Sequence, residues 1–79
     1  RRRNVTPLLW AQTSNNLGAA CFALAKRTNE DYLLQEAAAC FQGAIQVFRQ
    51  LRGQKKRAKV IAQNLLRVEQ MLNEDEDAA

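Results

Sequence analysis

An apolar side chain recurs every three or four residues from Leu34 to Leu51, and this spacing constrains the fold more than any other feature of the sequence. It is the spacing of one face of an α-helix, and it predicts a helix over residues 31–52. The 79 residues include 13 alanines but only one proline and three glycines, a composition that favours helices over strands. We therefore expect one small all-α domain.

Two further helices are predicted on either side of this one. The first covers residues 7–27, because Thr6 can cap free amides and Pro7 suits the first helical position. Its expected buried face is the stripe of Trp10, Thr13, Leu17, Ala20, Cys21 and Leu24. Thr28 or Asn29 is expected to cap the helix over residues 31–52, and Gly53 to end it.

The third predicted helix covers residues 55–73, with Ile61, Leu65, Val68 and Leu72 on its apolar face. Residues 1–6 form a basic arm, and the acidic run at 74–79 has too few apolar residues to fold, so we expect a disordered tail. Because the connections are short, consecutive helices should be antiparallel neighbours.

A weak internal repeat links the first and third helices. An offset of 48 aligns Asn16 with Asn64 and Leu17 with Leu65, and it superposes the two apolar faces. The third helix is thus predicted to begin a second, incomplete copy of the hairpin formed by the first two.

Two patterns resemble the halves of a tetratricopeptide repeat. They are Ser14-x2-Leu17-Gly18-x2-Cys21 in the first helix and Ala37-x3-Phe41-x2-Ala44 in the second, while residues 10–18 resemble the WAQTQNNLG opening of bacterial tandem arrays of this repeat. The resemblance implies a hairpin over residues 7–52 with lengthened helices and a capping helix at 55–73, as a fragment of a right-handed α-solenoid. The residues it implies for packing within the repeat are Leu17, Gly18, Cys21, Ala37, Phe41 and Ala44. The sequence departs from the family in having Cys21 where Tyr is usual and in lacking the closing proline.

The resemblance also implies a protein-protein interaction scaffold that binds a peptide or helix of a partner in a groove lined by the first and third helices. The positions that would face this groove are Gln12, Asn15, Asn16, Ala19, Phe22 and Ala23 on the first helix, and Gln63, Asn64, Arg67 and Met71 on the third. Amides in such a groove can both donate to and accept from a peptide backbone, and Arg67 could pair with a carboxylate of an acidic partner. Alternatively, Asn16 and Asn64 bond a neighbouring helix or face water, and Phe22 packs on the third helix.

Two other functions are open. Homo-oligomerisation would use the surface around Leu9 and Trp10, which a preceding repeat would otherwise cover. Nucleic-acid binding would use Arg1 to Arg3 and the basic run Lys55 to Lys59, but no aromatic residue is interleaved with that run for base stacking.

Chemistry at the surface is not expected. The chain has no histidine and two cysteines, so we expect no metal site, no cofactor and no enzymatic activity. Cys21 and Cys40 are predicted to be buried free thiols. Polar residues interrupt every apolar run before residue 26, which excludes a signal peptide or membrane span and favours a cytoplasmic location. Because the sequence begins with Arg rather than Met, we expect it to be part of a longer protein.

Overall fold

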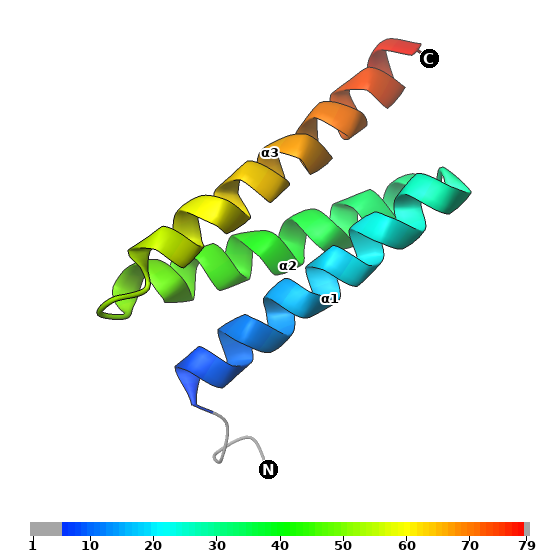
Figure 1. The fold of residues 1–79 in the computed structure, drawn as a ribbon. Helices are drawn as coiled ribbons and strands as arrows, with labels where there is room; N and C mark the ends of the chain where they lie inside the picture. Colours follow the sequence, from blue (N-terminus) through cyan, green and yellow to red (C-terminus); the bar gives the residue numbers. More distant parts are fainter. Residues whose placement is uncertain (1–5, 79) are drawn as a thin grey trace.

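The computed structural model describes the backbone of residues 6–78 and the side chains of residues 6–74 (Figure 1). Three α-helices follow one another: α1 (Pro7–Thr28), α2 (Asp31–Gln50) and α3 (Lys55–Ala78). No strand occurs within this described range, and the predicted all-α class is confirmed. Residues 1–5 of the predicted basic arm lie outside the described residues.

The first helix begins as predicted but ends in an unexpected way. The Leu9 N–H donates to the Thr6 hydroxyl oxygen at 3.1 Å, and this bond satisfies one of the free amides of the first turn. Asn29 takes a left-handed backbone with φ of 60°, and its N–H donates to the Ala25 carbonyl at 2.8 Å. Asparagine tolerates this conformation better than most residues, so Asn29 ends α1 instead of capping α2.

The prediction that Thr28 or Asn29 caps α2 is therefore wrong. Thr28 is the last residue of α1, and the N-cap of α2 is Glu30, whose side chain makes no capping hydrogen bond. The first turn of α2 instead contains Asp31, and a carboxylate there interacts favourably with the positive end of the helix dipole.

A four-residue turn, Leu51 to Gln54, joins α2 to α3. The Gln54 N–H donates to the Leu51 carbonyl at 3.3 Å, and Gly53 has φ of 80°. A type II turn requires a positive φ at its third residue, which glycine adopts without steric strain. α2 thus ends at Gln50, two residues before the predicted end, because Leu51 takes an extended backbone and begins the turn.

The third helix is longer than predicted. α3 continues to Ala78, so the disordered tail expected at residues 74–79 is wrong as far as residue 78; residue 79 lies outside the described residues. That prediction considered apolar content alone. Once a helix has formed, each further residue adds one backbone hydrogen bond and only its own backbone has to be fixed. Glutamate and alanine are also good helix formers.

The central helix is α2, which packs against both α1 and α3 (Figure 1). α1 and α3 run in the same direction and α2 runs opposite to both, as short connections require. The Cα trace measures 43 × 26 × 15 Å along its principal axes, so the three helices form a flattened body.

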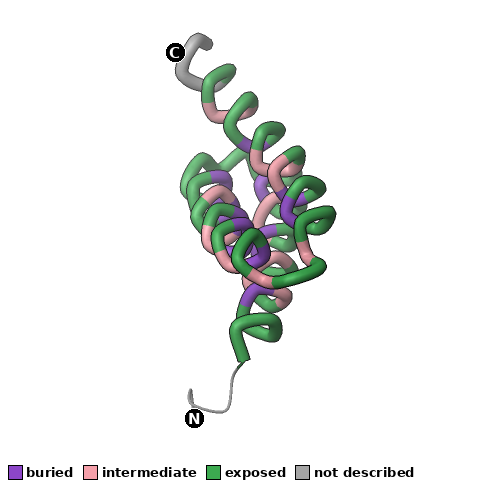
Figure 2. Tube along the Cα trace, turned by 90° about the vertical axis from the view of Figure 1, so that its left-hand side faces the viewer, coloured by how far each residue is buried: buried purple, intermediate pink, exposed green. Residues whose placement is uncertain are grey.

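The core is built around the apolar stripe of α2, and the buried positions of the three helices face the neighbouring helices (Figure 2). The buried residues of α2 are Leu33, Leu34, Ala37, Phe41, Ala44, Ile45 and Phe48. α3 adds Ala58, Ile61 and Val68. The stripe predicted for residues 31–52 is therefore the centre of the hydrophobic core.

The first helix buries a different face from the predicted one. Its buried residues are Ala11, Gly18 and Ala25, which are small and recur every seven residues. Trp10, Leu17 and Leu24, which also recur every seven residues, remain 46%, 52% and 46% exposed. Leu17, expected to pack the two helices together, thus lies mainly in solvent, as do Thr13 and Ala20.

Gly18 explains why the small face is the one that packs. A Cβ atom on Gly18 would lie 2.8 Å from two ring carbons of Phe41 and 3.2 Å from the Cβ of Cys40. Phe41 is only 1% exposed, so its ring has no free space to move into. The close approach of α1 to α2 therefore requires a residue without a side chain at position 18.

Burial relates α1 to α3 by an offset of 50 residues, not 48. Each residue from 9 to 24 has the same burial class as the residue 50 positions later. The predicted offset of 48 instead pairs buried Gly18 with exposed Leu66, and exposed Asn16 with half-buried Asn64. Asn16 and Asn64 therefore do not occupy equivalent positions on the two helices.

Alanine substitutions at two mid-helix glycines should have opposite effects on stability. Gly18→Ala should lower the free energy of unfolding by about 1–3 kcal/mol, because the new methyl group overlaps the enclosed Phe41 ring. Gly43→Ala should raise it by about 0.5–1 kcal/mol, the gain for alanine over glycine in a helix. Its methyl group would meet only the tip of the Trp10 ring at 3.0 Å, and that ring is half exposed and can shift. Urea denaturation followed by circular dichroism measures both values, and equal changes would contradict the packing argument.

Candidate functional site

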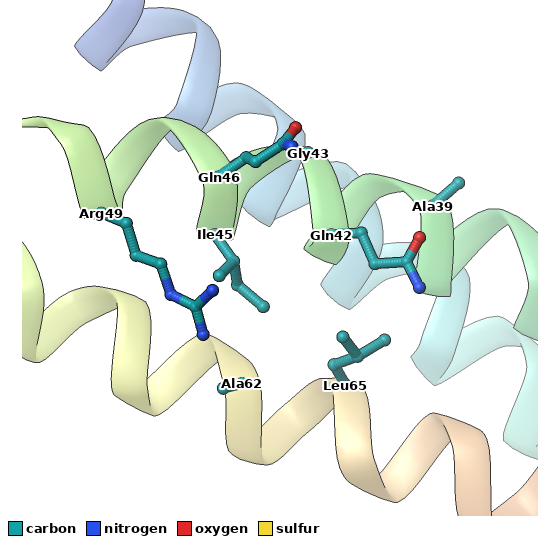
Figure 3. Close-up of a pocket in the computed structure, with 8 residues that line it drawn as sticks. All are labelled: Ala39, Gln42, Gly43, Ile45, Gln46, Arg49, Ala62 and Leu65. Carbon is teal, nitrogen blue, oxygen red and sulfur yellow. The ribbon is translucent and has the colours of Figure 1, made fainter.

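A hollow of about 550 Å³ lies along the seam between α2 and α3 (Figure 3). Its lining residues are Ala39, Gln42, Gly43, Ile45, Gln46 and Arg49 of α2, with Ala62 and Leu65 of α3. Gln42 and Arg49 extend from α2 toward α3, where Ala62 and Leu65 lie opposite them. A second hollow of about 400 Å³ is lined by Arg49, Lys55, Ala58, Lys59 and Ala62. Because the two share Arg49 and Ala62, we treat them as one surface and call it the seam groove.

Helix periodicity places these side chains together. Gln42 and Arg49 are seven residues apart and therefore share one face of α2, beside its buried stripe. Ala58 and Ala62 are four residues apart on α3 and are small, so the space between the helices stays open beside them. The groove thus has an apolar floor and a polar edge.

One end of the seam groove is positively charged. Arg49, Lys55 and Lys59 all line the smaller hollow, and no carboxylate is among the residues that line either hollow. Arg57, in the same basic run, instead lies over the Phe48 ring with its guanidinium carbon 5.5 Å from the ring centroid. Arg57 thus contributes to helix packing, and three cations remain at the groove.

The partner-binding residues predicted from the sequence do not line this groove. The predicted residues that are exposed are Asn16, Ala19 and Ala23 on α1 and Gln63 and Arg67 on α3. Those that are half-buried are Gln12, Asn15 and Phe22 on α1 and Asn64 and Met71 on α3. Phe22 packs against the core, and the Lys26 ammonium lies 4.7 Å from its ring centroid. This side chain is therefore largely covered by its neighbours.

Sequence reasoning missed Gln42 and Gln46, and it assigned the basic run Lys55 to Lys59 to the alternative of nucleic-acid binding and not to a groove shared with α2. A usable signal exists in the sequence: Gln42, Gln46 and Arg49 are spaced by four and three residues and so follow the edge of the apolar stripe of α2. That Arg49 lines a hollow together with Lys59 depends on the packing of α3 against α2.

Asn15 has an unusual environment among the predicted binding residues. Its Oδ1 atom is buried and has no hydrogen-bond partner within the described residues. An unpaired polar atom of this kind costs free energy in the folded state. At the offset of 50, the equivalent residue of α3 is Leu65, which is apolar and equally half-buried.

Replacing Asn15 with leucine should therefore stabilise the fold. We expect Asn15→Leu to raise the free energy of unfolding by about 1 kcal/mol, because it removes the unpaired buried oxygen. The matched control Asn16→Leu, at the next and exposed position, should change it by less than about 0.5 kcal/mol. Thermal and urea unfolding of both variants provides the comparison. A loss of stability in Asn15→Leu would mean that the amide is satisfied in solution.

A second notable surface is the exposed apolar row of Trp10, Leu17 and Leu24, which we call the α1 ridge. The three side chains are spaced by seven residues, so they lie above one another on one side of α1. The tip of the Trp10 ring lies against Gly43 of α2, but nearly half of the residue stays exposed. Large apolar side chains gathered in this way are typical of protein contact surfaces.

The two cysteines are free and half-buried, both on the facing sides of α1 and α2. Burial raises the pKa of the Cys40 thiol, and the neighbouring Cys21 and Glu36 raise this pKa further. A thiol with a raised pKa is mostly protonated at neutral pH and is a poor nucleophile. Cys40 thus behaves as a small packing residue.

Within the described residues, no group of three or more His, Cys, Asp or Glu side chains is placed to hold a metal ion. The same part of the chain contains no helix with the length and apolar content needed to cross a membrane. Comparison with protein families, curated proteins and solved structures gives no match.

Proposed function

We propose that this chain is a protein-protein interaction module, of the tetratricopeptide type that its sequence resembles, and that it binds a peptide segment of a partner protein in the seam groove. The proposal includes the finer fold description, a repeat hairpin of α1 and α2 with α3 as a capping helix of an α-solenoid.

The observation that carries the proposal is the composition of the groove. Ile45, Ala62 and Leu65 provide apolar surface, which gains free energy when a partner covers it. Gln42 and Gln46 have amides that can donate to and accept from a peptide backbone. A concave apolar surface with a few polar groups at its edge is the usual form of a ligand site.

Selection from a random peptide library tests this proposal and locates the site. We expect selected peptides to bind wild-type protein and to lose at least about tenfold in affinity, or about 1.4 kcal/mol, to Ala62→Trp, because the indole fills the groove. Ala19→Trp is the matched control, since Ala19 is exposed on α1 within the surface predicted from the sequence. Fluorescence anisotropy gives the affinities, and circular dichroism checks that each variant folds.

Each outcome has a distinct meaning. Loss of binding only in Ala19→Trp would move the site to the α1 surface and refute the seam groove. Failure of the library to yield any peptide sensitive to either substitution would refute peptide binding. Because Ala62 is half-buried, Gln42→Ala at an exposed position provides a second variant that leaves the core unchanged.

A second candidate function is homo-oligomerisation through the α1 ridge, favoured by the half-exposed Trp10, Leu17 and Leu24. We expect the double variant Leu17→Gln, Leu24→Gln to weaken self-association, because two apolar contacts are lost. Leu66→Gln is the control, since Leu66 is an equally exposed leucine on α3. Sedimentation velocity over a range of concentrations measures the effect, and a wild-type protein that stays monomeric at high micromolar concentration would exclude this function.

A further inference from the structure

We propose that the occupant of the seam groove is an acidic-apolar peptide, with clustered carboxylates at the Arg49, Lys55 and Lys59 end and apolar side chains over Ile45 and Leu65. This inference rests on the proposed function, because it specifies the chemistry of the partner segment that the same groove binds.

The cationic end of the groove draws side chains from both helices. Lys55 and Lys59 are four residues apart and share one face of α3, while Arg49 extends from α2 toward Ala62 (Figure 3). All three line the same hollow, and all three are exposed. Guanidinium and ammonium groups form their strongest hydrogen bonds with carboxylates or phosphates, so an anion is the ligand that this end favours.

The rest of the groove favours a peptide over a nucleic acid or a free anion. Its floor, made by Ile45, Ala58, Ala62 and Leu65, is aliphatic, and an inorganic anion would leave it uncovered. No aromatic side chain lines either hollow, so bases have no platform on which to stack. From Lys55 to Leu65 the groove follows about 15 Å of helix axis, enough for four or five residues of extended peptide.

Glu69, one helical turn beyond the residues that line the groove, decides which end of the partner segment carries the acidic residues. Glu69 follows Leu65 by one turn on the same face of α3 and is exposed. A carboxylate of the partner placed there would meet a like charge, whereas at the Arg49 end it meets three cations. The acidic residues of the partner should therefore be clustered at one end of its segment.

Binding of synthetic peptides to the 79-residue chain tests this directly. The probe is fluorescein-labelled Asp-Asp-Glu-Leu-Ala-Leu, the neutral control is Asn-Asn-Gln-Leu-Ala-Leu, and Asp-Leu-Asp-Ala-Glu-Leu has the same composition with dispersed charges. We expect the neutral peptide to bind at least about tenfold more weakly, because charge-assisted hydrogen bonds are lost. The dispersed peptide should also bind more weakly than the probe.

Two charge reversals on neighbouring lysines locate the contact. Lys59→Glu should weaken binding of the probe about tenfold, because Lys59 lines the groove. Lys56→Glu makes the same change in net charge within the same basic run, but Lys56 lines neither hollow, so its effect should stay below about twofold. A peptide with three lysines in place of the acids should bind Lys59→Glu better than wild type.

Several results would overturn this inference while leaving the proposed function intact. One is a set of groove-dependent library peptides without acidic residues; another is equal loss of probe binding in Lys56→Glu and Lys59→Glu, the mark of non-specific attraction. A single-stranded oligonucleotide that displaces the probe and binds more tightly would assign the basic end to nucleic acid. Absence of any Ala62-dependent peptide would instead refute the proposed function itself.

Discussion

The contact between the Phe41 ring and the bare backbone at Gly18 is the constraint on which the rest of the structure depends. The ring fills the space that a side chain at position 18 would occupy, and this fixes which face of α1 turns inward. Ala11 and Ala25 are then buried on the same side of α1, and Trp10, Leu17 and Leu24 are turned outward. Each residue of the α1 ridge directly precedes a buried residue, so the ridge lies about 100° around α1 from the close contact with α2.

The middle helix carries most of the core because it alone has neighbours on two sides. Its stripe contains two phenylalanines, Phe41 and Phe48, which are among the largest fully buried side chains. α1 and α3 each contact α2 through one narrow face, as their matching burial at an offset of 50 indicates. In a chain this small, such a division leaves much apolar surface in solvent.

Periodicity predicted the helices well and the burial of α1 poorly, for a physical reason. In α2 the large apolar residues and the buried positions coincide, so the stripe can be read directly from the sequence. In α1 a small set and a large set both recur every seven residues, and the spacing of three and four residues selected a stripe that contains the larger set. The choice depends on the shape of the partner, here the ring of Phe41, which one helix cannot reveal. The seam groove was missed for a similar reason, since Gln42 and Lys59 each look like ordinary solvent-facing residues until α2 and α3 are paired.

The turn at Leu51 to Gln54 makes the two ends of the seam groove different. At the cationic end the two walls are joined covalently through four residues, with Gly53 in a backbone conformation that few other residues adopt. The spacing between Arg49 and Lys55 is therefore set by the chain itself. At the other end the two walls are held together by side-chain packing, with Val68 fully buried and Met71 and Leu72 packed against the core. An occupant of the seam groove would therefore meet covalently joined walls at its cationic end and walls joined by side-chain packing at the other.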